Sequence, residues 1–341
     1  MIKRTTIGID LAKNSFYFVV LNEHGKRTTR KKLTRNQVLP CLVNFEQSVV
    51  AMEACSSAHY WGREIQKMGH EVQLLPPQHV KGYLRGQKND YNDAQAVEEA
   101  AQHGAIRPVA IKTVEQQQSI LHMRRLLIVE RTRLINHIRG LLSEYGIVIA
   151  KSAATVRKEI PLILEGADNR LTDIFRQFLN RQYSRLLHIE ELHFHQIYIE
   201  STAKDDDICQ RLISMPGIGS IVSISLKSWI GDGKQFKRGR DASAALGLVL
   251  RQNSTGGKTV LLGISKRGNS HLRSLVVNGA RAVVAHAKNK IDCLSLWINR
   301  LVEHRGFNRA VIAFANKMIR TVWAIVTKKQ EYRTMEKLIA G

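Results

Sequence analysis

Four acidic residues in the first hundred positions have types and a spacing that could hold metal ions. Asp10 ends the strand-like stretch TTIGID, and Glu53 ends the short apolar stretch SVVAMEA. Asp90 and Asp93 lie three apart in QKNDYNDAQA, a spacing that places both carboxylates on one face of a helix. Because strand ends of a mixed α/β sheet gather at one edge, we expect the four carboxylates to meet there.

Carboxylates gathered in this way repel one another unless a cation neutralises them. Mg²⁺, or Mn²⁺ in its place, suits a set of hard oxygen ligands. Two such ions about 3.5–4 Å apart can stabilise the attacking and leaving oxygens of a phosphodiester. Plain structural roles also fit, with Asp90 capping a helix, Asp93 complementing its dipole and Asp10 pairing with a lysine. The spacing alone leaves both interpretations open.

The elements that must position these acids follow from hydrophobic periodicity. Alternation of apolar and polar residues predicts an antiparallel meander of strands at 5–11, 14–22 and 27–33. Helices and strands then alternate: a helix at 35–47, a strand at 48–54, a helix from 58, a strand at 71–77, a helix from 90 and a last strand at 107–113. This order predicts a mixed α/β sheet.

Beyond position 114 the pattern becomes helical. Apolar residues recur with helical spacing over 115–145, and the segment 170–200 looks similar. Two long helices with apolar stripes favour an antiparallel pair or an oligomer seam, hence a dimer or tetramer. The remainder, 208–341, reads as helical and punctuated by glycines.

The stretch Pro216-Gly217-Ile218-Gly219 lies between two apolar helical segments, which is the form of a helix-hairpin-helix. Its glycine turn, with Gly217 and Gly219, would expose backbone N–H groups that hold a phosphate without reading sequence. The alternative is a plain turn between two helices with a glycine C-cap.

Basic residues dominate the next stretch, in which Asp241 is the only acid between Lys234 and Arg281. A run this one-sided favours a phosphate-binding surface over a merely solvated face. The basic residues are Lys234, Lys237, Arg238, Arg240, Arg251, Lys258, Lys266, Arg267, Arg273 and Arg281.

The composition points the same way. The 341 residues include 52 Lys and Arg against 29 Asp and Glu, for a formal charge of +23. Such a charge drives association with polyanions, of which nucleic acid is the default and an anionic membrane the rival. No uninterrupted apolar run has the ~18–20 residues that span a bilayer, so we expect no membrane association. The four cysteines are widely separated, which favours reduced thiols in a cytosol.

Three stretches resemble the acidic blocks of the DEDD transposases of bacterial insertion sequences. They are IGIDLAKNSFYFVVLNEHGK, AMEACSSAHYWGREI and RGQKNDYNDAQAVEEAA. That family has a RuvC-like N-terminal domain with the ribonuclease H fold. The resemblance implies that Asp10, Glu53, Asp90 and Asp93 are its four catalytic, metal-holding acids.

The second half carries the rest of the resemblance, which runs from Ile7 to about Val326. GLVLRQNSTGGKTVLLGISKRGNSHLR is similar to the family's second domain, in which a serine nucleophile stands just before a glycine, and GFNRAVIAFANKMIRTVWAIV is similar to its closing block. The match places the nucleophile at Ser254, although counting from the preceding block selects Thr255. We prefer Ser254 because a primary hydroxyl is less hindered.

The expected fold is therefore α/β plus all-α. A ribonuclease-H-like (RuvC-like) mixed-sheet catalytic domain would cover residues 1–113. A long helical, coiled-coil-like segment would cover 114–205. A helical domain with the helix-hairpin-helix and the serine would cover 206–341.

The implied function is a bacterial DNA recombinase of the cytoplasm and nucleoid. Its partners would be donor DNA, target DNA and a structured guide RNA encoded by the element. Metal-assisted attack by the serine would leave a phosphoserine bond that a new hydroxyl reverses. Two alternatives remain: a Mg²⁺-dependent RuvC-like nuclease such as a Holliday-junction resolvase, and a non-enzymatic nucleic-acid scaffold. An actin-like kinase is disfavoured, because Ala12 stands where its first phosphate loop needs glycine.

Overall fold

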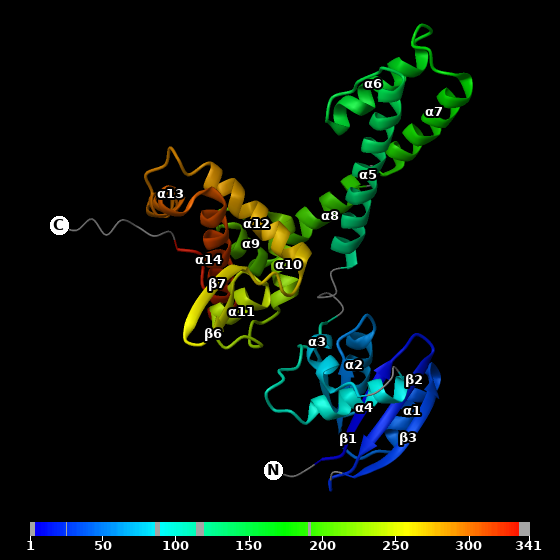
Figure 1. Cartoon of the computed structure of the whole chain (residues 1–341), viewed down its shortest axis with the longest axis vertical. Coiled ribbons are helices and arrows are strands. Elements are labelled where there is room, and N and C mark those ends of the chain that lie inside the picture. Colours follow the sequence, from blue (N-terminus) through cyan, green and yellow to red (C-terminus); the bar gives the residue numbers. More distant parts are fainter. Residues whose placement is uncertain (1–3, 25, 86–88, 114–118, 190–191, 334–341) are drawn as a thin grey trace, which may run out of the picture. The chain divides into compact units, whose positions relative to one another are not determined.

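Two structural units divide the chain, residues 1–117 and 118–341, and each is described by itself. The structure is a computed structural model that describes residues 4–24, 26–85, 89–113, 119–189 and 192–333 (Figure 1).

A five-stranded sheet with the order β3-β2-β1-β4-β5 forms the centre of the first unit. Its strands are β1 (Thr6–Leu11), β2 (Ser15–Leu21), β3 (Arg27–Thr34), β4 (Val49–Glu53) and β5 (Glu71–Leu75). The first three pair antiparallel, while β4 pairs parallel with β1 and β5 parallel with β4. This confirms the expected mixed α/β sheet.

The last strand expected in this unit, at 107–113, was wrong. Only one antiparallel bridge forms there, in which the Val109 N–H donates to the Leu74 carbonyl at 2.6 Å. Pro108 explains the interruption, because it has no N–H to donate and restricts the residue before it.

Alternation along β1 sends its side chains to two different layers. Ile7 and Ile9 are fully buried in one core with residues of α1 and α2. Gly8 and Asp10 point to the opposite face, where α4 packs. Asp10 therefore lies on the α4 side of the sheet.

Short helices complete the first unit. They are η1 (Arg35–Gln37), α1 (Val38–Val43), α2 (Ala58–Lys67), α3 (Pro77–Val80), η2 (Lys81–Tyr83) and α4 (Asp90–Ala101). A small second core, made by α4 with β4, β5 and α3, includes Ala51, Leu75, Val80 and Val97. The alanines of α4 allow the helix to lie close to the sheet.

The second unit begins with four helices: α5 (Ser119–Glu144), α6 (Ala153–Glu165), α7 (Asp173–His188) and α8 (Leu192–Lys204). α7 packs against α5 and α6, as Figure 1 shows in green. The expected single helix over 170–200 was wrong, because α7 ends at His188 and α8 begins at Leu192. α6, which the pattern did not predict, contributes Val156 and Ile160 to the shared core.

The rest of this unit contains α9 (Asp207–Ile213), α10 (Ser220–Ile230), α11 (Gly239–Ala245), α12 (Ser270–Ala285), α13 (Cys293–Arg305) and α14 (Phe307–Lys328). α14 is its central helix and contributes nine buried residues, Phe314 and Met318 among them. α14 is also the one helix of the described residues that is long and apolar enough to cross a membrane, and 50% of its apolar window is buried inside the unit. Its apolar face therefore has a partner in the core.

A β-hairpin interrupts the helices of the second unit, which corrects the wholly helical expectation for 208–341. Its strands are β6 (Leu250–Thr255) and β7 (Lys258–Ile264). Gly256 and Gly257 form the turn with φ of +55° and +78°. Two successive residues with positive φ are the requirement of a type I′ turn, whose twist matches that of paired strands.

Candidate active site

Two of the predicted acids lie near the ends of neighbouring parallel strands, Asp10 one residue before the end of β1 and Glu53 at the end of β4. Ile9 of β1 pairs with Met52 of β4, and Asp10 and Glu53 are the next residues of each strand. Both carboxylates therefore leave the sheet at the same edge and on the same face, which is the face that α4 covers.

The other two acids lie in the first turn of α4. Asn89 is the N-cap residue, and its side-chain oxygen accepts a hydrogen bond from the Tyr91 N–H at 2.9 Å. This assigns the capping role to Asn89, so Asp90 is not the cap that a structural interpretation would require. Asp90 and Asp93 are thus left to face the end of β1.

The structure brings Asp10, Asp90 and Asp93 together. One carboxylate oxygen from each lies within 4.8 Å of the others, as ligands of a shared metal ion must. Glu53 is not in this group of three but is close enough to interact electrostatically with both Asp10 and Asp93. The donor atoms are all oxygens, which fits a hard divalent cation.

Burial and the crowding of negative charge both raise the pKa values of two of these acids. Burial, followed by the charges of Asp93, Asp90 and Glu53, raises the pKa of Asp10 to about 6. Burial and the charge of Asp93 also raise the pKa of Glu53, against the opposing effect of Lys81. A divalent cation would relieve this repulsion, which makes the cluster an electrostatic match for one.

A glycine lets the helix approach the strand closely enough to form this cluster. A Cβ added at Gly8 would lie 2.4 Å from the Ala94 carbonyl oxygen and 2.6 Å from the Glu98 Cβ. Only glycine fits at such a contact. The same helix presents Asp93 immediately before Ala94, and Asp90 about one turn before it. The sequence held a signal for this, because a glycine inside a strand often marks a close backbone approach.

Two further contacts fix α4 on the sheet. The rings of Tyr17, which is opposite Asp10 on β2, and Tyr91 pack edge to face with centroids 4.9 Å apart. The fully buried Glu98 accepts a hydrogen bond from Arg27 Nε at 3.3 Å, while burial raises the pKa of its carboxyl group. Sequence reasoning missed these residues, because no local pattern marks a contact between distant elements.

The predicted nucleophile lies in the second unit, on the hairpin. Ser254 is in strand β6, opposite Thr259, and is exposed. Its Oγ lies 2.7 Å from Gln252 Nε2, whose N–H donates to it. Because the Ser254 oxygen accepts this bond, its own proton remains available to a base. The expected glycine-rich loop is thus a strand followed by a two-glycine turn.

Thr255, the other candidate for the nucleophile, is the next residue of β6. Thr255 pairs with Lys258 and is also exposed. Successive residues of a strand point to opposite faces of the hairpin. Ser254 and Thr255 therefore present their hydroxyls on different faces.

The predicted helix-hairpin-helix corresponds to α9, a turn and α10. Gly217 has a φ of +86°, and a Cβ added there would lie 2.8 Å from the Gly279 carbonyl of α12, so this glycine is packed against another helix. Gly219 is exposed and is the N-cap residue of α10. Of the two glycines, Gly219 is the one whose surroundings are open to a ligand.

The predicted basic residues divide into three places. Lys234, Lys237 and Arg238 are exposed on the segment leading into α11, and Arg240 is exposed in the first turn of that helix. Arg251 and Lys258 are exposed on the hairpin, and Lys266 and Arg267 follow it. Arg273 differs, because its guanidinium donates hydrogen bonds to the carbonyls of Leu246 and Arg267, at 3.1 and 2.7 Å. Arg273 therefore holds the base of the hairpin against α12.

A five-stranded sheet of this order, with acids grouped at one edge, defines a DEDD-type domain of the ribonuclease H class. Residues 7–147 match the DEDD transposases of the IS110 type, and residues 209–293 match the family described as "Transposase IS116/IS110/IS902 family". The chain therefore belongs to the IS110/IS116 family of insertion-sequence transposases, and it is an enzyme. The resemblance seen in the sequence is confirmed.

Relatives of nearly the same length support this assignment. The chain is 44% identical to the transposase for insertion sequence element IS1111A of Coxiella burnetii, over 96% of this chain and 91% of that protein. It is 39% identical to a probable family 20 transposase of Pseudomonas aeruginosa, over 96% of this chain and 98% of that protein. It is 35% identical to the transposase for insertion sequence element IS1328 of Yersinia enterocolitica, over 95% of this chain and 97% of that protein.

Proposed function

We propose that this transposase cuts and rejoins DNA through a covalent phosphoserine bond at Ser254, assisted by Mg²⁺ or Mn²⁺ at Asp10, Glu53, Asp90 and Asp93. The observation that carries the proposal is the convergence of Asp10, Asp90 and Asp93 from separate elements. Helix capping does not explain it, because Asn89 caps α4.

The chemistry exchanges one phosphodiester for another. Ser254 Oγ attacks the phosphorus and loses its proton to a base, the bond from phosphorus to the leaving strand's oxygen breaks, and that oxygen takes up a proton. The bound cation supplies charge stabilisation for the phosphoryl oxygens. A hydroxyl from another strand then attacks the phosphoserine and releases Ser254. The number of phosphoester bonds is unchanged, so no nucleotide hydrolysis is required.

Choice of the target is delegated to a structured guide RNA that the element encodes. The charge of +23 and the exposed basic residues of the second unit favour contacts to phosphate backbones over readout of bases. Each exchange involves donor and target DNA, with more than one strand to be cut. We therefore propose a homodimer or tetramer, acting on the bacterial chromosome in the cytoplasm.

Replacement of the acids tests the metal site. Asp10→Asn and Asp93→Asn should each abolish strand cleavage in Mg²⁺, because a lost ligand removes transition-state stabilisation. Affinity for nucleic acid should stay within about twofold, since binding rests on the basic residues. Full cleavage by Asp10→Asn in Mg²⁺ would rule out this site.

Trapping an adduct tests the nucleophile. Incubation with DNA that carries the element ends, and with the guide RNA, should join the protein to a DNA end through a bond that survives denaturing electrophoresis. Ser254→Ala should remove the adduct and recombination without affecting folding or binding, because the side chain is exposed.

Two neighbouring variants control this test. Thr259→Ala, opposite Ser254 on the same hairpin, should leave the adduct intact. If Thr255→Ala alone abolishes the adduct, the nucleophile is Thr255. If Ser254→Ala nicks DNA at the wild-type rate, water is the nucleophile and the enzyme is a RuvC-like nuclease.

A further inference from the structure

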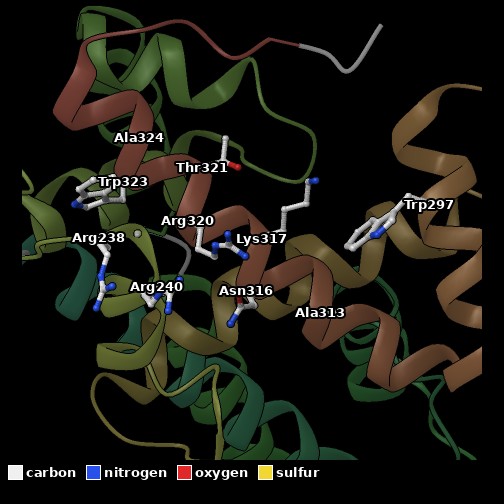
Figure 2. Close-up of a pocket in the computed structure, with 11 residues that line it drawn as sticks. Arg238, Arg240, Trp297, Ala313, Asn316, Lys317, Arg320, Thr321, Trp323 and Ala324 are labelled. Atoms are coloured by element: carbon white, nitrogen blue, oxygen red, sulfur yellow. The ribbon is translucent and has the colours of Figure 1, made fainter. Parts of the chain in front are cut away.

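The second unit contains a cavity of about 570 Å³ that none of the proposed chemistry uses (Figure 2). It lies between the start of α11, α13 and the middle of α14. Four cations and two indoles dominate its lining: Arg238, Arg240, Lys317, Arg320, Trp297 and Trp323. The volume is in the range of pockets that hold small organic ligands, roughly 300–1,000 Å³.

Close backbone packing builds one end of the cavity. A Cβ added at Gly239 would lie 3.0 Å from the Arg320 carbonyl oxygen, so the start of α11 lies directly against α14. The Trp323 indole N–H donates to the carbonyls of Gly233 and Phe236, each at 3.2 Å, and fixes the turn that precedes Arg238. Arg238 and Arg240 are thereby held on either side of Gly239, next to Arg320.

The charged residues that the structure places in the lining are all basic. Among the described residues no acidic residue lines the cavity, and no carboxylate forms an ion pair with the guanidinium of Arg238, Arg240 or Arg320. Asp241 accepts a hydrogen bond from the backbone N–H of Arg238 only. These three guanidinium groups repel one another, which disfavours a purely structural role. Guanidinium groups bind phosphate through paired N–H donors, so the fitting ligand is a phosphate ester.

The opposite end of the cavity is aromatic. Trp297 of α13 is partly buried, and Lys317 Nζ lies 5.0 Å from its ring centroid. Figure 2 shows the indole pointing toward Lys317 across the cavity. The N–H of Trp323 is bound to backbone carbonyls, whereas the Trp297 ring lines the cavity with the Lys317 ammonium over it. A base that takes the place of this flexible side chain can stack on the ring.

We infer that this cavity binds one unpaired nucleotide of a single-stranded nucleic acid. Its phosphate is held by Arg238, Arg240 and Arg320, and its base stacks on Trp297, with Lys317 beside it. A base in a duplex has both faces covered by its neighbours, so the site selects an unpaired strand. The inference rests on the proposed function only in that the protein handles nucleic acid.

Binding of short strands tests the inference without any catalysis. The full chain carrying Ser254→Ala is titrated in EDTA with a labelled 12-nucleotide single strand, an abasic strand of the same length and the matching duplex. Trp297→Ala should weaken binding of the base-bearing strand by tenfold or more, since stacking contributes about 1–3 kcal/mol per base. Binding of the abasic strand should change by less than about twofold.

A charge variant covers the risk that Trp297→Ala disturbs the core, against which the indole packs. Arg320→Gln, at an exposed position, should weaken binding of the base-bearing and abasic strands alike. It should also reduce the magnitude of the slope of log K against log salt by about 0.7. Arg309→Gln, exposed on the same helix but outside the lining, is the matched control and should leave affinity within about twofold.

Three results would overturn the inference. Equal losses from Arg309→Gln and Arg320→Gln would mean diffuse attraction and no built site. If a folded Trp297→Ala variant loses the same affinity for the base-bearing and abasic strands, or loses no affinity for either, the base does not stack on Trp297. If Trp297→Ala weakens binding of the duplex as much as binding of the single strand, an unpaired nucleotide is excluded. Because the assay contains no metal and no Ser254, its failure is separate from a failure of the recombinase proposal.

Discussion

The surroundings of Asp10 favour the binding of a cation at the expense of the stability of the folded state. Its carboxyl is half-buried beside Asp90 and Asp93, and its pKa is raised to about 6, chiefly by burial. Above that pH the ionised carboxylate destabilises the folded state relative to the unfolded chain, whose aspartates titrate near 3.9. Carboxylates crowded in this way favour metal binding at the expense of stability.

Asp10→Asn should therefore stabilise the metal-free protein. The gain should be fully present above about pH 6, shrink as pH falls through 6 and disappear near pH 4, where Asp10 is neutral in both states. Because the side chain is partly exposed, we expect about 1 kcal/mol, or a few degrees in the melting temperature. Calorimetric melts in EDTA between pH 4 and 8 measure this difference.

Adding Mg²⁺ provides the control. It should raise the melting temperature of the wild type, since a ligand that binds only the folded state stabilises it, and should have little effect on Asp10→Asn. A wild type that is more stable than Asp10→Asn at pH 8 in EDTA would contradict this account of the cluster.

The convergence of Asp10, Asp90 and Asp93 could be predicted from the sequence, but the residues that bring these acids together could not. Asp10 and Glu53 stand out because each ends an apolar strand, and Asp90 and Asp93 because of their helical spacing. The contact between Tyr17 and Tyr91 joins positions far apart in the chain and leaves no local trace. Such contacts are set by tertiary packing, which periodicity does not encode.

At the scale of elements, the site depends on how closely α4 lies on β1. The fully buried Glu98 and the Gly8 backbone are in direct contact in this packing. Any outward shift of α4 would carry Asp90 and Asp93 away from Asp10, because both are in the same rigid helix.

Gly8→Ala should impair catalysis without touching any acid. The added methyl group would lie 2.4 Å from the Ala94 carbonyl oxygen, so α4 has to move. Overpacking of this kind destabilises by about 1–3 kcal/mol, and we expect strand cleavage to be lost while nucleic-acid binding persists. Melting temperature and cleavage rate measure the two effects. Gly104→Ala, with open space around its added Cβ, is the control and should change neither.

The hairpin that carries Ser254 depends on its turn. Gly256 has a positive φ, which asparagine tolerates and valine does not. Gly256→Val should therefore lower the adduct yield at Ser254 by tenfold or more, while Gly256→Asn should retain most of it. The melting temperature should stay the same in both, since the hairpin is exposed. Equal adduct yields from the two variants would show that the turn does not position the serine.

Two element boundaries lay beyond sequence reasoning for a physical reason. Between Leu171 and Lys204 there is no glycine or proline, so no local signal divides α7 from α8. Their partners differ instead, because α7 packs on α5 and α6, whereas α8 packs on α5, α9 and α10. The hairpin differs, because the sequence does carry its turn signal, Gly256-Gly257, but a glycine pair is typical of loops as well as of hairpin turns.

At the scale of the whole molecule, positive charge is the dominant property. The formal charge is +23, and the exposed cations of the α11 segment and the hairpin belong to the second unit. The clustered acids Asp10, Asp90 and Asp93 belong to the first unit. Affinity for nucleic acid and catalysis of strand exchange should therefore be separable by mutation.

Salt dependence measures this separation. Each phosphate neutralised on duplex DNA adds about −0.9 to the slope of log K against log salt, so a surface engaging several phosphates should give a slope of about −4 or steeper. Asp10→Asn should have the wild-type slope, with or without Mg²⁺. Arg251→Gln and Lys258→Gln should each reduce its magnitude by about 0.9. Lys67→Gln, at a lysine whose ammonium lies 2.8 Å from Glu64, should leave it unchanged. A wild-type slope near zero would remove the electrostatic basis of the proposed function.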